Sequence, residues 1–136
     1  MIIDIKTYRK TEVIDITAKI ESYIKGDGLV NIFAKHTTTA IIVADMDPNS
    51  DTDLLQAIQA MTPKVNWIHP HDPNHYPDHL FSSLLGVSLT IPFLEDKLEL
   101  GKWQKIIFVE LDGPKNREIA LSFIQTQEHP TTISIT

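Results

Sequence analysis

Hydrophobic and polar residues alternate in two short stretches at the start of the chain. Residues 3–7 read Ile-Asp-Ile-Lys-Thr, and the same period of two returns in residues 12–16. Alternation of this kind is typical of strands that bury one face. We therefore expect two half-buried strands that form an opening hairpin.

Five later segments are rich in β-branched and aromatic side chains and are bounded by turn residues, a pattern typical of strands. They are residues 29–34, 39–44, 88–92, 105–110 and 117–123. The run at 105–110 is so apolar that a second sheet or a neighbouring subunit must cover it.

Three segments show helical features. Residues 17–25 place Ile20 and Ile24 four positions apart, and glycines follow them. A second helix has its apolar face at positions 54, 55, 58 and 61, with Ser50 or Asp51 as the expected cap and an end near Pro63. A short third helix is expected at residues 79–85.

Residues 67–78, with three prolines and three histidines, are expected to be a long functional loop.

This order of hairpins and helices predicts an α+β fold with mainly antiparallel sheets. The chain has 136 residues, which fits one domain over residues 1–136. A dinucleotide-binding fold is disfavoured, because no glycine-rich turn follows the first strand.

Composition narrows the possible partners and location. The formal net charge is −6, which opposes binding to nucleic acid or to anionic membranes. No apolar run is long enough to span a bilayer and the N-terminus does not resemble a signal peptide, so we expect a cytoplasmic protein. The chain has no cysteine, and any metal must therefore bind to His, Asp or Glu.

Four of the six histidines, at positions 69, 71, 75 and 79, lie within eleven residues. Imidazole is a common ligand of zinc, so the cluster indicates a metal or anion site, although a polar loop with exposed histidines has the same composition. Pro77 indicates an irregular backbone before the helix. His75 is therefore expected on the rim of the site.

Other candidates lie near strand ends. His36 precedes three threonines whose hydroxyls can bond an anion, although a single histidine between apolar strands is more often a core residue. Asp45 is free for metal binding or proton transfer. Glu110 and Arg117 flank a turn, either as functional groups or as a simple ion pair.

Five motifs in order resemble the YjbQ family, which is described as secondary thiamine-phosphate synthases. They are His36-Thr37-Thr38-Thr39-Ala40, Asp45-Met46-Asp47-Pro48, His79 with residues 82–89, residues 101–104, and Glu110-Leu111-Asp112-Gly113-Pro114. The resemblance runs over nearly the whole chain. It implies a β-sandwich of two mainly antiparallel sheets with two to three helices, assembled as a homotrimer.

The resemblance also implies a divalent metal, zinc by preference and magnesium where the substrate is a diphosphate. Its ligands would be His36, His69 and His79, with His71 as the competitor of His69. The implied reaction joins a pyrimidine methyl diphosphate to a thiazole phosphate and releases diphosphate.

In that reaction the small phosphorylated substrate would be bound by Thr37, Thr38, Ser82 and Arg117. Asp45 or Glu110 would handle protons, and Arg117 would also act catalytically as an anion clamp.

Two alternatives stay open. The same histidines could serve a metal-dependent hydrolase of a phosphate ester or amide, or a trimeric metal-binding protein without catalysis. The chain departs from the family pattern at Phe81, where a basic residue is often found. If that basic residue contacts a phosphate, the affinity for diphosphate would be weaker in this protein.

Overall fold

The computed structural model describes residues 1–127 and 132–135. The strands are β1 (Ile2–Lys6), β2 (Glu12–Asp15), β3 (Gly28–Ala34), β4 (Thr39–Ala44), β5 (Ser88–Leu94), β6 (Lys97–Leu98), β7 (Lys105–Glu110) and β8 (Asn116–Gln125). The helices are α1 (Thr17–Glu21), α2 (Ser50–Met61), the 3-10 turn η1 (Pro73–His75) and α3 (Tyr76–Leu85).

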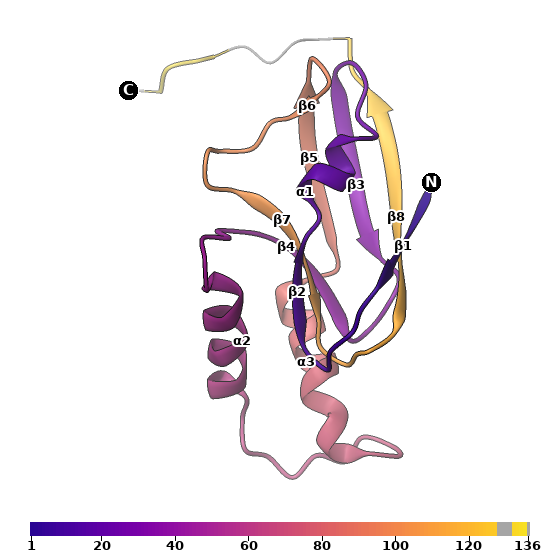
Figure 1. The fold of residues 1–136 in the computed structure, drawn as a ribbon, viewed down its shortest axis with the longest axis vertical. Helices are drawn as coiled ribbons and strands as arrows, with labels where there is room; N and C mark the ends of the chain where they lie inside the picture. Colours follow the sequence, from indigo (N-terminus) through magenta and orange to yellow (C-terminus); the bar gives the residue numbers. More distant parts are fainter. Residues whose placement is uncertain (128–131, 136) are drawn as a thin grey trace.

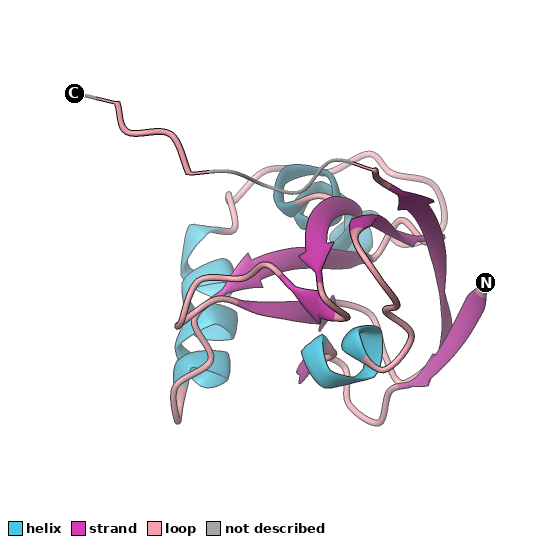
Figure 2. Cartoon of the chain, turned by 90° about the horizontal axis from the view of Figure 1, so that it is seen from above, coloured by secondary structure: helices cyan, strands magenta, loops and turns pink. Residues whose placement is uncertain are grey.

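The strands form two antiparallel sheets, which confirms the predicted α+β class. The larger sheet has the order β1-β8-β3-β5-β6 and the smaller one the order β2-β7-β4. Figure 1 shows the two sheets with α2 and α3 at one end of the molecule, and Figure 2 shows α2 outside the strands.

The predicted opening hairpin is wrong, because its two strands belong to different sheets. β1 pairs with β8, with Ile3 opposite Ile119, and β2 pairs with β7, with Val13 opposite Val109. The segment between β1 and β2 crosses from one sheet to the other. Alternation along a strand reports that one face is buried, but it does not specify which strand lies alongside.

The smaller sheet is buried on both faces, and this explains the continuous apolar run of β7. Ile106 and Phe108 pack against the larger sheet, in one cluster with Val30, Ile119 and Leu121. Ile107 and Val109 pack on the other side, in a cluster that includes Ile58 of α2 and Phe81 of α3. The chain's own second sheet and helices therefore cover β7, so this strand by itself gives no reason for a neighbouring subunit.

The helix boundaries differ from prediction in two places. Asn49, with a φ of 72°, precedes α2 at the cap position expected for Ser50 or Asp51. α3 begins at Tyr76 rather than near His79, because Pro77 lies in the first turn, where no backbone N–H is required. Within the described residues, no helix is long and apolar enough to cross a membrane.

Candidate functional site

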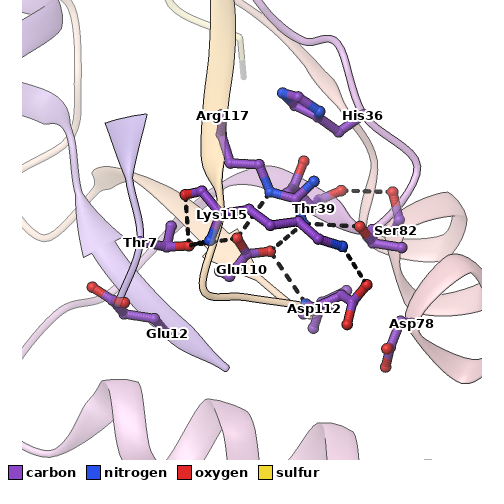
Figure 3. Close-up of polar contacts among 12 residues, drawn as sticks. Thr7, Glu12, His36, Thr39, Asp78, Ser82, Glu110, Asp112, Lys115 and Arg117 are labelled. Atoms are coloured by element: carbon purple, nitrogen blue, oxygen red, sulfur yellow. Dashed lines mark hydrogen bonds and ion pairs between the residues drawn. The ribbon is translucent and has the colours of Figure 1, made fainter. Parts of the chain in front are cut away.

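A buried ion pair closes one end of the sandwich. Arg117 on β8 donates from Nε to Glu110 Oε1 at 2.8 Å and from Nη2 to Glu110 Oε2 at 2.5 Å. The Thr7 hydroxyl donates to Glu110 Oε1 at 2.7 Å, and Arg117 Nη2 also donates to Thr38 Oγ1 at 2.9 Å. Figure 3 shows Thr7, Glu110 and Arg117 together. The pair links one strand of each sheet, so it fixes how the two sheets meet.

These bonds hold Glu110 in its ionised form. Burial by itself would raise the pKa of Glu110, but hydrogen bonds from Arg117, Thr7 and the Asp112 N–H keep that pKa below its ordinary value. The side chain has no exposed surface. Glu110 therefore acts as a fixed anion that orients Arg117. Of the two interpretations of these residues, the ion pair is the one that their geometry shows.

A hollow of about 390 Å³ lies over this pair and opens to solvent. Three parts of the chain meet there: the segment before β4, the start of α3, and the turn between β7 and β8. Its lining residues are Lys35, His36, Thr37, Thr38, His75, His79, Asp112, Lys115 and Arg117. The structure thus brings together five of the predicted site residues: His36, Thr37, Thr38, His79 and Arg117.

Sequence reasoning missed Lys35 and Lys115 as lining residues. Each carries a partner at the surface: Lys35 Nζ lies 3.2 Å from Glu118 Oε2, and Lys115 Nζ lies 2.6 Å from Asp112 Oδ2. Lys35 directly precedes His36, and Lys115 lies two residues before Arg117. This closeness in sequence to predicted site residues could have identified both lysines.

The hydrogen bonding of His36 determines its tautomer. Its Nε2 accepts the backbone N–H of Glu118 at 2.8 Å, so in the neutral ring the proton is on Nδ1. Burial and the charge of Arg117 lower the pKa of His36 below its ordinary value of 6.5, which favours this neutral form. Neither nitrogen then offers a free lone pair to a metal, so His36 does not fit the predicted ligand set.

His79 has the opposite tautomer. Its Nδ1 lies 3.2 Å from the Thr37 carbonyl oxygen and 3.1 Å from Thr37 Oγ1. A carbonyl oxygen only accepts, so Nδ1 carries the proton and Nε2 keeps its lone pair. Burial, with smaller effects of His75 and His69, lowers the pKa of His79 below 6.5. His79 therefore fits the role of a metal ligand.

Two other histidines lie against His79. The ring centroid of His69 is 4.8 Å from that of His79, and the centroid of His75 is 4.7 Å from it. His71 is exposed and has a φ of 73°, so its backbone turns away from regular structure. His69, rather than its competitor His71, is the loop histidine that joins His79.

His75 lines the hollow beside His79, but the irregular backbone that Pro77 led us to expect before the helix is wrong. His75 comes directly before α3, and its Nδ1 lies 2.9 Å from Asp78 Oδ2. Pro77 starts the helix instead of interrupting it, so His75 and His79 lie one turn apart on the same side. With Asp112, His75 and Asp78 form the only group of three or more His or acidic residues in the described chain whose ligand atoms lie within 4.8 Å of one another.

Two predicted site residues lie away from the hollow. Asp45 follows the far end of β4 (Thr39–Ala44), which at about 3.3 Å per residue places it roughly 20 Å from Thr38. Asp45 therefore does not lie in the hollow, so it is not placed to handle protons for a substrate bound there. Ser82 is 2% exposed and its hydroxyl donates to the Thr39 carbonyl at 2.6 Å, so it fastens α3 to β4 and is not placed to bind substrate.

An apolar cleft of about 420 Å³ adjoins the histidines on the loop side. It is lined by Trp67, Ile68, His69, Pro70 and Tyr76. The rings of Trp67 and Tyr76 have centroids 5.1 Å apart. The site thus combines a charged hollow with an aromatic cleft, and His69 and His79 lie between them.

Comparison with known proteins agrees with the motifs. Residues 1–126 match the family described as UPF0047 protein YjbQ-like. A UPF0047 protein of Methanocaldococcus jannaschii is 38% identical over 126 residues, which cover 88% of this chain and 90% of that protein. A UPF0047 protein of Archaeoglobus fulgidus is 35% identical over 121 residues, which cover 88% of this chain and 96% of that protein.

Solved structures agree as well. A YjbQ/UPF0047 family protein of Clostridium acetobutylicum has a TM-score of 0.82 and 32% identity, with 91% of this chain and 99% of that chain covered. Protein APE1520 of Aeropyrum pernix has a TM-score of 0.82 and 32% identity, with 93% and 98% covered. This chain therefore belongs to the YjbQ-like UPF0047 family.

Proposed function

We propose that this protein is an enzyme that binds a small phosphorylated substrate in the hollow over Arg117. Its reaction would be that of secondary thiamine-phosphate synthases: a pyrimidine methyl diphosphate joins a thiazole phosphate and diphosphate leaves. The observation that carries the proposal is the convergence of Lys35, Lys115 and Arg117 on one solvent-open hollow.

The lining residues have the chemistry that such a substrate requires. Lys115 and Lys35 place positive charge at the exposed edge, each beside one carboxylate, while Glu110 holds Arg117 in place below them. The His36 Nδ1–H adds a neutral donor. Negative charge grows on the departing diphosphate, and donors that are already in position stabilise that charge without reorganising.

The predicted divalent metal, zinc or magnesium, stays a proposal that follows from the family resemblance. His79 fits as a ligand and His69 lies beside it, but neither ring nitrogen of neutral His36 has a free lone pair. A bound ion would supply charge neutralisation for phosphate oxygens. Elemental analysis of the purified protein, with His79→Ala as the comparison, tests its presence.

The homotrimer is likewise a proposal. On the outer face of the larger sheet, Ile2 is paired with Ala120, and Ala120 with Phe33. Ile2 is 49% exposed and Phe33 is 42% exposed, so this row leaves apolar surface that a second copy could cover. Light scattering at micromolar concentration and neutral pH tests the assembly, and a monomer would contradict it.

The function is tested by measuring both binding and turnover. Lys115→Met should weaken binding of inorganic diphosphate about threefold to tenfold, because it removes one cation of the hollow. Lys97→Met, which removes the same charge on β6, should leave binding unchanged. Formation of thiamine phosphate from the two substrates by the wild-type protein would support the reaction. Diphosphate binding without that product would contradict the synthase and leave hydrolysis to be assayed.

A further inference from the structure

The Lys10 ammonium lies among three oxygens from two separate parts of the fold. Lys10 Nζ lies 2.6 Å from Asp78 Oδ2, 2.7 Å from the Leu111 carbonyl oxygen and 3.1 Å from Asp112 Oδ1. Asp78 belongs to α3, while Leu111 and Asp112 belong to the turn after β7. The fold has therefore gathered a set of oxygens around one positive charge.

An imidazole completes this set. His75 Nδ1 lies 2.9 Å from Asp78 Oδ2, and its Nε2 lies 3.6 Å from Asp112 Oδ2. Two carboxylates, a carbonyl and an imidazole are a donor set that suits manganese, magnesium or zinc. We call the four residues Asp78, Leu111, Asp112 and His75 the cation cage.

We propose that the cation cage is a divalent-cation site and that the Lys10 ammonium occupies it when no metal is bound. This site is distinct from the set His36, His69 and His79 that the family resemblance implies. The cage includes two side chains that also line the hollow, His75 and Asp112. A cation held there would border the place where a phosphate group binds.

Lys10 can leave without disturbing the fold. Its side chain is 58% exposed, and its backbone carbonyl is held separately by the Gly113 N–H at 2.9 Å. Only the side chain has to swing into solvent. The exchange replaces one positive charge with two next to Asp78 and Asp112, and Lys115 stays on the other Asp112 oxygen. The hollow therefore becomes more positive when the cage binds a metal.

If Lys10 competes with the metal, removing its ammonium should raise the affinity for Mn²⁺. A variant that merely folds poorly would lose affinity instead. Binding of Mn²⁺ is measured by calorimetry and by the loss of the free-ion EPR signal, with no substrate present. Lys10→Met should bind Mn²⁺ at least about tenfold more tightly than wild type, because the internal competitor is gone. Lys97→Met, the matched loss of charge on β6, should change the affinity less than about twofold.

Two further variants identify the ligands. Asp112→Asn should weaken Mn²⁺ binding at least about tenfold, whereas Asp53→Asn, the matched change on α2, should change it less than about threefold. The proposal is overturned if Lys10→Met binds no more tightly than wild type, or if Asp112→Asn binds as well as wild type. Loss of binding in His79→Ala with normal binding in Asp112→Asn would place the ion on the histidines instead. None of these outcomes depends on thiamine phosphate formation, so the site and the proposed reaction can fail separately.

Discussion

Two ion-pair systems meet near the end of β7, one through Glu110 and the other through Asp112, yet they differ in character. Glu110 and Arg117 are 0% and 6% exposed, and strand pairing holds the backbone of both. Lys10 and Asp78 are 58% and 22% exposed, and Lys10 lies on the segment between β1 and β2. The first pair is part of the architecture, whereas the second is an exposed contact at the edge of the hollow.

The difference follows from access to water. A buried charge that loses its partner cannot be solvated, so the remaining charge destabilises the fold strongly. A charge at the surface regains water when its partner leaves, and the net effect is small. The end of β7 and the turn after it thus connect a buried ion pair, Glu110 with Arg117, to an exposed one, Asp112 with Lys10.

The largest effect should come from breaking the buried pair. Arg117→Met leaves Glu110 ionised and unpaired inside the protein, and we expect a loss of about 3–5 kcal/mol in the free energy of unfolding. Chemical denaturation measures it. The double variant with Glu110→Gln should recover part of the loss, and no recovery would contradict the ion-pair explanation.

Acid should weaken the same pair. The pKa of Glu110 is lowered in the folded state, so an unfolded chain takes up a proton first as the pH falls. The stabilisation is therefore complete above the ordinary carboxyl pKa of 4.5 and is lost as the pH falls from there through the lowered folded value. Unfolding free energies measured from pH 7 downward should show a steeper acid loss in wild type than in Arg117→Met. Equal slopes would remove Glu110 as the cause.

An intermediate effect is expected at Ser82, which lies buried beside the hollow. Ser82→Ala removes the hydrogen bond to the Thr39 carbonyl, and it should cost about 1 kcal/mol of unfolding free energy. Diphosphate binding should stay within about twofold of wild type, because the hydroxyl holds α3 on β4. A larger loss of binding with normal stability would restore Ser82 as a substrate ligand.

The smallest effect should come from Lys10, the exposed counterpart of Arg117. Lys10→Met should change the free energy of unfolding by less than about 1 kcal/mol in metal-free buffer. Denaturation of both methionine variants under the same conditions makes the comparison direct. Similar losses in the two variants would show that the Lys10 contacts are also structural.

The sequence by itself determined the strands and the region of the site. The continuous apolar run of β7 indicated that both of its faces are covered. The close spacing of the histidines at 69, 75 and 79 indicated that their side chains lie near one another in the folded protein. Motif order was enough to indicate the YjbQ family. Each of these signals is local, because the buried face of a strand, the residue types and their spacing can all be identified within a single segment.

Only the tertiary structure decided how those segments meet. The partner strands of β1 and β2, the separation of Asp45 from Thr38, and the gathering of oxygens around Lys10 depend on which sheet each strand joins. The tautomer of His36 depends on one backbone N–H of β8, eighty-two positions away. Pairing and hydrogen bonding over such distances are settled by packing of the whole chain, and a local pattern does not contain them.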